Sequence, residues 1–267
     1  MRRETEKIGI KGRRINKKFG ISSFLHYLCR LKMAKGLFEF RQFTIHQEEC
    51  AMKVGTDGTL LGAWATAREG QCRILDIGTG TGLMALMMAQ RYPEAEITGI
   101  DLDEKAVFQA QANAMASPFA NRIRIQQADV NSFTDKPFDS IVCNPPFFVD
   151  SLTCPDARRS QARHAETLTY ETLILSVKRL LDTNGVFSVI IPTDYRSQLL
   201  SEASLSGLML TRECFVRTTP KKSPKRCLME FRWRPVATVD TATETLEMKP
   251  RERSEWYHQL TKEFYLY

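Results

Sequence analysis

From about residue 70 onward, short apolar runs alternate with longer segments of helical character, and this alternation is the feature that most constrains the fold. The apolar runs at residues 73–77, 96–100, 138–143 and 186–191 have the length and composition of buried strands. Between them lie segments with apolar residues at helical spacing, such as 82–91 and 170–181. Strands that alternate with helices indicate βαβ units and a parallel sheet covered on both faces.

The C-terminal third follows a different pattern. Residues 208–217 and 226–234 are two strand-like runs, and the eight residues between them leave no room for a helix. Two strands joined by so short a connection must run antiparallel. We therefore predict an α/β fold: a doubly wound, mostly parallel, seven-stranded sheet that ends in an antiparallel hairpin, with a last helix at about 254–264.

Basic residues are concentrated at the N-terminus. Residues 1–35 carry eleven of the 38 Lys and Arg residues and two of the 31 Asp and Glu residues, so the remainder of the chain is close to neutral. Such a segment can contact nucleic acid through its phosphates, although a disordered tail has the same composition. We expect residues 1–36 to form a flexible basic arm and residues 37–267 to form one domain.

The cysteines and the apolar runs exclude several classes of protein. The seven cysteines are scattered without a C-x-x-C pair, which is typical of reduced thiols in a cytoplasmic protein rather than of disulfides or a zinc site. No apolar run approaches the roughly 20 residues that cross a bilayer. We expect a cytoplasmic location, no membrane contact and no metal. The oligomeric state does not follow from the sequence.

A glycine-rich loop follows the first parallel strand. In Asp76-Ile-Gly-Thr-Gly-Thr-Gly82, the glycines Gly78, Gly80 and Gly82 permit a tight turn and a close approach of ligand to backbone. A dinucleotide-binding loop would need a glycine at Leu83. An acidic residue at Asp76 suits a cationic amino-acid group better than a pyrophosphate, which favours S-adenosylmethionine as the ligand.

Two further carboxylates follow the next strands. Asp101 ends the second strand and can accept the two hydroxyls of a ribose, with a strand-end cap as the alternative interpretation. Asp129, after the third strand, is placed to reach an adenine amine, but Asp is also common in turns.

The tetrapeptide Asn144, Pro145, Pro146 and Phe147 directly follows the strand at 138–143, and ligands of such sheets bind at the carboxyl ends of strands. The Asn144 side-chain oxygen and the Pro145 carbonyl can accept the two N–H bonds of an amine, which turns its lone pair toward a methyl donor. The prolines fix the backbone, and Phe147 offers a face for base stacking. This pattern predicts methylation of an exocyclic or amide nitrogen without a metal.

These motifs, together with the run Lys53-Val-Gly-Thr-Asp57, resemble the bacterial family of tRNA1(Val) adenine-37 N6-methyltransferases. The resemblance extends from about residue 37 to the end of the chain and implies a methyltransferase domain that modifies N6 of that adenine. By position it also implies that Lys53, Thr56 and Asp57 lie over the methionine end of the cofactor. The family more often has Tyr where this chain has Phe147, a difference that retains stacking and loses a hydroxyl.

The substrate prediction rests on the hairpin loop and on access to the base. Arg217, Lys221, Lys222, Lys225 and Arg226 can hold RNA phosphates, although a solvated loop has the same composition. An adenine amine is reached most readily in an unpaired stretch such as an anticodon loop. Methylation of protein glutamine, methylation of DNA adenine, and an inactive RNA-binding role for the fold are the alternatives.

Overall fold

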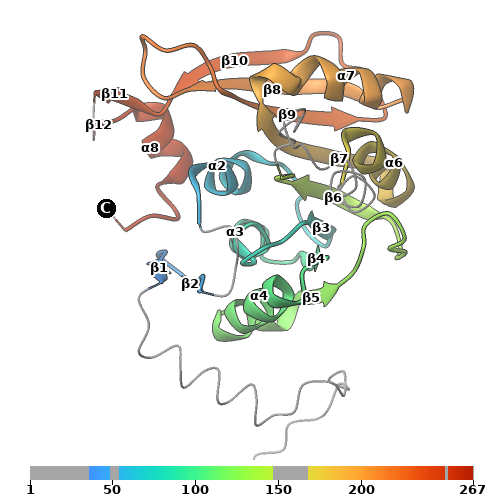
Figure 1. The fold of residues 1–267 in the computed structure, drawn as a ribbon, viewed down its shortest axis with the longest axis vertical. Helices are drawn as coiled ribbons and strands as arrows, with labels where there is room; N and C mark the ends of the chain where they lie inside the picture. Colours follow the sequence, from blue (N-terminus) through green and yellow to red (C-terminus); the bar gives the residue numbers. More distant parts are fainter. Residues whose placement is uncertain (1–35, 49–53, 147–167, 250–251, 267) are drawn as a thin grey trace, which may run out of the picture. The chain divides into compact units, whose positions relative to one another are not determined.

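The computed structural model describes residues 36–48, 54–146, 168–249 and 252–266 of the 267-residue chain. Its centre is a sheet in the order β10-β8-β9-β7-β6-β3-β4-β5 (Figure 1). Five neighbouring strands run parallel: β3 (Arg73–Ile77), β4 (Glu96–Asp101), β5 (Ile123–Gln127), β6 (Phe138–Cys143) and β7 (Leu181–Pro192). Strand β9 (Arg226–Arg232) is antiparallel to β7 and to β8 (Met209–Arg217), which confirms the predicted hairpin.

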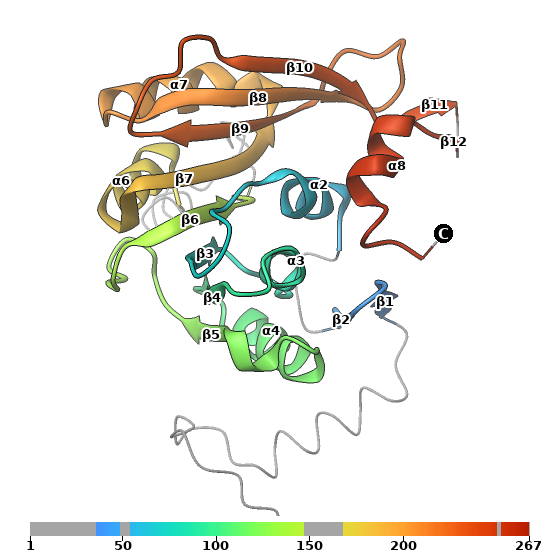
Figure 2. The same ribbon diagram turned by 180° about the vertical axis from the view of Figure 1, so that it is seen from behind.

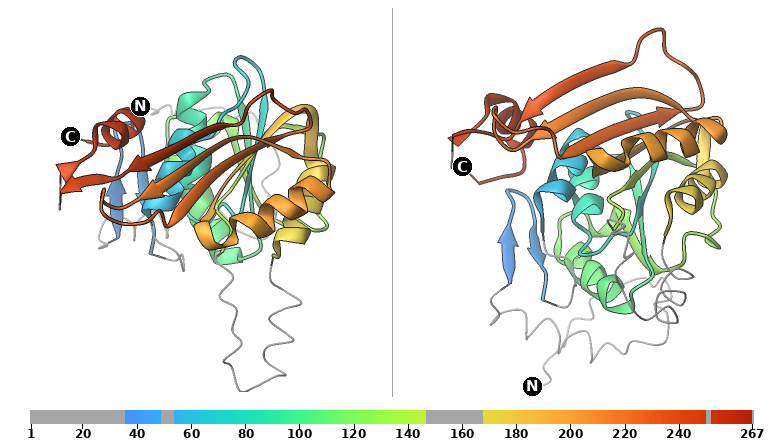
Figure 3. Two further views of the ribbon diagram at one scale, coloured as in Figure 1. Left: turned by 90° about the horizontal axis from the view of Figure 1, so that it is seen from above. Right: turned by 45° about the horizontal axis from the view of Figure 1, so that its top comes forward.

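The sheet has an eighth strand that the sequence analysis does not predict. Strand β10 (Asp240–Thr245) pairs in parallel with β8 at the edge of the sheet. Its sequence Asp-Thr-Ala-Thr-Glu-Thr contains no apolar run, and most of its residues are exposed or half-buried. An edge strand with one solvated face needs few apolar side chains, so an apolar-run criterion overlooks it. Figure 3 shows β8, β9 and β10 side by side.

Helices cover both faces of the sheet, as expected for a doubly wound fold. One core is shared by side chains of α2 (Thr56–Trp64), α3 (Leu83–Arg91), α4 (Glu104–Ala116) and α8 (Glu255–Thr261). The other core takes side chains from α6 (Tyr170–Leu180) and α7 (Arg196–Leu205). Figure 2 labels both helices.

The positions of three helices follow from local sequence. In α3, the seven consecutive residues from Leu83 to Ala89 are all buried, because the helix packs against both α2 and the sheet. Helix α4 is capped at its N-terminus by Asp103, whose side chain accepts a hydrogen bond from the Lys105 amide. Helix α6 begins with a capping box at Thr169 and has the apolar face of a helix that packs on one side.

A small hairpin near the N-terminus packs against the C-terminal segment. Strands β1 (Leu37–Glu39) and β2 (Thr44–His46) pair antiparallel. The Arg41 amide donates to the Phe264 carbonyl at 2.8 Å. The rings of Phe40 and Tyr265 are stacked, with 5.8 Å between the ring centroids. The remaining short elements are η1 (Ala120–Arg122), η2 (Thr193–Tyr195), β11 (Glu247–Lys249) and β12 (Glu252–Arg253).

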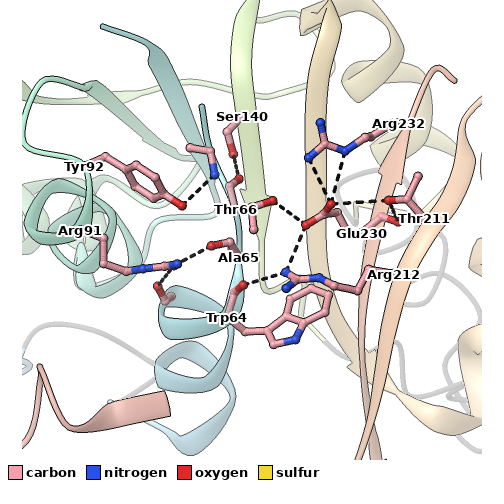
Figure 4. Close-up of polar contacts among 12 residues, drawn as sticks. Trp64, Ala65, Thr66, Arg91, Tyr92, Ser140, Thr211, Arg212, Glu230 and Arg232 are labelled. Carbon is pink, nitrogen blue, oxygen red and sulfur yellow. Dashed lines mark hydrogen bonds and ion pairs between the residues drawn. The ribbon is translucent and has the colours of Figure 1, made fainter. Parts of the chain in front are cut away.

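A polar network joins the end of α2 to the β8–β9 hairpin (Figure 4). Glu230 of β9 is 5% exposed and accepts from the Thr66 hydroxyl at 2.6 Å and from Arg212 Nη2 at 3.1 Å. Arg212 also donates to the Trp64 carbonyl and lies 3.6 Å from the centre of the Trp64 ring. The α2–β3 connection is therefore held to the hairpin by a buried carboxylate, a guanidinium and an aromatic ring.

Candidate active site

A cleft of about 360 Å³ opens at the carboxyl ends of β3 and β6. Three segments that are far apart in the sequence line it. They are the start of α2, the glycine-rich loop with the first turn of α3, and the residues that follow β6; the hairpin adds one residue. The lining residues are Val54, Gly55, Thr56, Asp57, Gly58, Gly78, Thr79, Gly80, Thr81, Leu83, Met84, Asn144, Pro145 and Arg226.

The glycine-rich loop takes a backbone course that favours glycine. Gly78, Gly80 and Gly82 all have positive φ, at 69°, 56° and 81°. A Cβ added at Gly78 would meet no atom within 4 Å, which is the expected result at an open ligand cleft. A Cβ at Gly82 would approach Ala110 Cβ to 3.3 Å, so this glycine also permits close packing of α4. Gly78 and Gly80 line the cleft, and Gly82 caps α3.

Asp76 lies beneath the loop. It is fully buried, and its Oδ2 accepts from the Thr79 hydroxyl at 2.7 Å and from the Ala85 amide at 3.1 Å. The carboxylate thus fixes the loop and replaces the side-chain cap that Gly82 cannot supply to α3. Burial raises the pKa of Asp76 to about 7. Its Oδ1 has no hydrogen-bond partner among the described residues, and the residue is not part of the cleft lining.

Asp101 supports the loop from the neighbouring strand. Its Oδ2 accepts from the Gly80 amide at 2.9 Å, and its Oδ1 accepts from the Asp103 amide at 3.0 Å. The residue is half-buried and lies outside the cleft lining. A carboxylate accepts about four hydrogen bonds, so these two leave capacity for the predicted ribose hydroxyls.

Asp129 has the bonding of a turn residue. It is exposed, and its Oδ1 accepts from both the backbone and the side-chain amide of Asn131 at 2.9 Å. This is the turn interpretation that the sequence left open. The contact with adenine remains a prediction, and the structure does not bring Asp129 into the cleft lining.

The catalytic motif begins at the cleft. The half-buried Asn144 and the buried Pro145 both line it, whereas Pro146 is exposed and does not. The Asn144 Oδ1 is buried and has no hydrogen-bond partner among the described residues. A buried amide oxygen without a partner is unfavourable by about 1–3 kcal/mol, and at a cleft a bound ligand can supply the missing donor. Phe147 and Lys53 lie outside the described residues.

Two of the predicted residues meet across the cleft. Thr56 and Asp57 open helix α2, and Arg226 opens strand β9. Arg226 Nε donates to Asp57 Oδ2 at 2.7 Å, so the predicted cofactor residue and the predicted RNA residue form an ion pair. Both side chains are partly exposed, at 21% for Asp57 and 30% for Arg226.

The remaining basic residues of the hairpin point elsewhere. Lys221, Lys222 and Lys225 are exposed, take part in no ion pair with the described residues, and do not line the cleft. Arg217 is half-buried and donates to the Thr245 hydroxyl at 2.9 Å. The four residues therefore differ in setting from Arg226.

Several cleft residues were not singled out from the sequence. Thr79 and Thr81 occupy the positions between the loop glycines, and Leu83 and Met84 form the first turn of α3. Their place inside or directly after the glycine motif was the available signal. Asn113 belongs to no motif that the sequence analysis could recognise. This buried residue of α4 donates to the carbonyls of His46 and Thr81 and so joins β2 to the glycine-rich loop.

Within the described parts of the chain, no group of three or more His, Cys, Asp or Glu side chains is arranged to hold a metal ion. The helices there are all too short or too polar to span a membrane. Cys72, Cys143, Cys214 and Cys227 are buried free thiols.

Comparison with known proteins places the chain among methyltransferases. Residues 55–208 match the model of the methyltransferase small domain. The chain is 48% identical over 238 residues to the tRNA1(Val) (adenine(37)-N6)-methyltransferase of Bacteroides thetaiotaomicron, covering 88% of this chain and 99% of that protein. It is 42% identical to the protein of the same name from Tolumonas auensis, covering 86% and 96%.

A solved structure agrees with the fold. The predicted O-methyltransferase Atu636 of Agrobacterium tumefaciens superposes with a TM-score of 0.58 and 19% identity, covering 79% of this chain and 98% of that one. At that identity, the likeness concerns the arrangement of strands and helices alone.

Proposed function

Because this chain belongs to the family of tRNA1(Val) (adenine(37)-N6)-methyltransferases, we propose that it methylates N6 of adenine 37 in tRNA1(Val). The methyl donor is S-adenosylmethionine. The single observation within the site that supports this chemistry is the buried Asn144 Oδ1, an acceptor at the cleft without a partner among the described residues.

The cleft fits the donor in size and in chemistry. Its volume of about 360 Å³ is within the usual range for small-molecule sites. Gly78 leaves open space where another residue would place a side chain, and Asp101 carries acceptor capacity for ribose hydroxyls at the end of β4. Bound there, S-adenosylmethionine supplies a methyl carbon that is electrophilic because it is attached to a sulfonium.

The protein orients the amine rather than deprotonating it. Asn144 Oδ1 and the Pro145 carbonyl accept the two N–H bonds of adenine N6, which favours a pyramidal nitrogen with its lone pair directed at the methyl group. Oxygen acceptors also suit the positive charge that develops on nitrogen during the transfer. The amine loses its surplus proton after the transfer, so no strong base is required in the cleft.

Substrate RNA is held, in this proposal, by the exposed lysines of the hairpin loop. Lys221, Lys222 and Lys225 precede Arg226, which lines the cleft, so phosphates on these lysines would lie near the target base. The base leaves its stack to enter the cleft, which an anticodon-loop purine does at low cost. We also propose that residues 37–267 act as the methyltransferase domain in the cytoplasm, where tRNA is modified.

Nucleoside mass spectrometry of tRNA from a strain that lacks the protein tests this function. We expect N6-methyladenosine to disappear from the valine tRNA and to return when the gene is restored, but not when the Asn144→Ala variant replaces it. Radiolabelled methyl transfer by the purified protein into total tRNA, total protein and DNA provides the second arm. Label in protein or DNA alone would show that the substrate assignment is wrong.

A further inference from the structure

The cleft contains one acidic and one basic side chain among its described lining residues, and the two are paired. Arg226 Nε lies 2.7 Å from Asp57 Oδ2. Asp57 is in the first turn of α2, and Arg226 is the first residue of β9, so the pair closes the cleft between two elements that are 169 residues apart in sequence. All other lining residues are apolar, hydroxyl-bearing, amide or glycine.

The setting of Arg226 differs from that of a phosphate-gripping residue. Its guanidinium is fixed from two sides, by Asp57 and by a bond from Nη1 to the Lys225 carbonyl at 3.1 Å. The side chain is 30% exposed, and the residue lines the cleft rather than the outer surface of the loop. An arginine fixed in this manner places a permanent positive charge at the wall of the cleft, where it attracts a small anion.

The amino-acid head of S-adenosylmethionine carries an ammonium and a carboxylate on one carbon. A neighbouring acid and base in the same cleft are the complement of such a zwitterion. We propose that Arg226 binds the α-carboxylate of the cofactor and that Asp57 binds its α-ammonium. This inference rests on the proposed cofactor, and it gives Arg226 a cofactor role in place of the RNA contact predicted from the sequence.

The position of Asp76 supports this assignment. The sequence pattern predicts that Asp76 meets the cationic head, but its carboxylate is fully buried beneath the loop and already holds Thr79 and Ala85. Asp57 is the carboxylate that lines the cleft. Of these two carboxylates, Asp57 is therefore the one that a ligand ammonium can reach.

Calorimetry with two ligands, in the absence of RNA, tests the assignment. S-adenosylmethionine is compared with its decarboxylated analogue, which retains the ammonium and lacks the α-carboxylate. We expect the wild-type protein to prefer the complete cofactor by about tenfold or more, as for a charge-assisted hydrogen bond in a partly exposed site. In Arg226→Gln the preference should fall to nearly one. In Asp57→Asn, affinity for both ligands should fall by similar factors.

A matched control separates loss of this contact from loss of an ion pair in general. Arg196 pairs with Glu213 through Nε at the same distance of 2.7 Å, is 27% exposed, and does not line the cleft. Arg196→Gln should retain the wild-type preference. If Arg226→Gln does not fold in a thermal melt, Arg226→Lys replaces it and must show a smaller preference than wild type.

The outcomes are distinct. An Arg226→Gln variant that still prefers the complete cofactor as strongly as wild type would overturn the assignment, and so would an effect confined to the affinity for tRNA. Wild-type protein that binds neither ligand would contradict the proposed function itself.

Discussion

Replacing Glu230 with glutamine should weaken both the fold and the cofactor cleft, because this residue fixes two of the elements that form the cleft. Glu230 is 5% exposed and accepts hydrogen bonds from Thr66 and Arg212, with Arg232 at 3.3 Å as a third partner. The substitution retains the shape of the side chain, removes its charge and leaves Arg212 without its buried counterion.

The expected loss of stability follows from these contacts. Breaking a buried ion pair by neutralising one partner destabilises a protein by about 3–5 kcal/mol. Arg212 retains its bond to the Trp64 carbonyl and its contact with the Trp64 ring, so the lower end of that range applies. For a domain of this size, about 3 kcal/mol corresponds to a decrease in Tm of about 6–12 °C.

The network also has a consequence for ligand binding. Its bonds hold the C-terminal end of α2, whose first turn carries Thr56 and Asp57, against β9, which begins with Arg226. A shift of α2 relative to β9 therefore alters the cleft wall directly. We expect Glu230→Gln to weaken binding of S-adenosylmethionine by about tenfold, the equivalent of roughly half of one charge-assisted hydrogen bond.

Glu213→Gln is the matched control. Glu213 is also 5% exposed and pairs with an arginine, Arg196, at 2.7 Å, but it has no bond to α2. Differential scanning calorimetry should give similar losses of stability for the two variants, while titration calorimetry at 20 °C should show weakened cofactor binding for Glu230→Gln alone. Equal cofactor affinities in the two variants would refute the argument that this network sets the cleft.

Three other predictions concern the site. Asn144→Ala should abolish methyl transfer while leaving the affinity for S-adenosylmethionine almost unchanged, measured by radiolabel transfer and calorimetry; a normal rate contradicts the clamp. Burial raises the pKa of Asp76 from 3.8 to about 7. Between these two pH values the folded state keeps a proton on Asp76 that the unfolded state has lost. The group therefore lowers the free energy of unfolding as pH rises from about 4 to 7. Urea unfolding should show that the stability of Asp76→Asn relative to wild type increases by about 3 kcal/mol between pH 5 and pH 8. A constant difference would mean that the carboxyl titrates normally. Finally, replacing Lys221, Lys222 and Lys225 with alanine should weaken the salt dependence of tRNA binding. The slope of log K against log salt concentration should fall in magnitude by about 2–3, while cofactor affinity, the control, stays the same. An unchanged slope would show that these lysines do not contact the RNA.

The sequence predicts the central part of the fold well because that part is buried. Strands such as β3 and β6 are mostly apolar and mostly buried, since a parallel sheet covered on both faces admits few polar side chains, and their ends agree with the prediction. Strand β10 and helix α7 were not predicted. Both have a polar, weakly periodic sequence. Strand β10 is fixed by pairing with β8, and helix α7 is fixed by the packing of Leu199 and Ala203 into the core.

The site divides in the same way. The glycine loop and Asn144 are recognisable because their spacing from a buried strand is local information, and the structure places both at the cleft. The pairing of Asp57 with Arg226 is not local information. Asp57 belongs to a motif near the start of the domain, and Arg226 belongs to a basic loop near its end. Only the antiparallel pairing of β9 with β7 brings the two residues together.

The cleft also differs from the Glu230 network in how its side-chain carboxyl and amide oxygens are satisfied. Both oxygens of Glu230 accept hydrogen bonds within the protein, and the network contributes to stability. By contrast, Asn144 Oδ1, which lies at the cleft, and Asp76 Oδ1, which lies beneath the glycine-rich loop, are buried without a partner among the described residues. Unpaired buried acceptors lower stability by about 1–3 kcal/mol each. For Asn144, which lines the cleft, the proposed donor is the adenine amine.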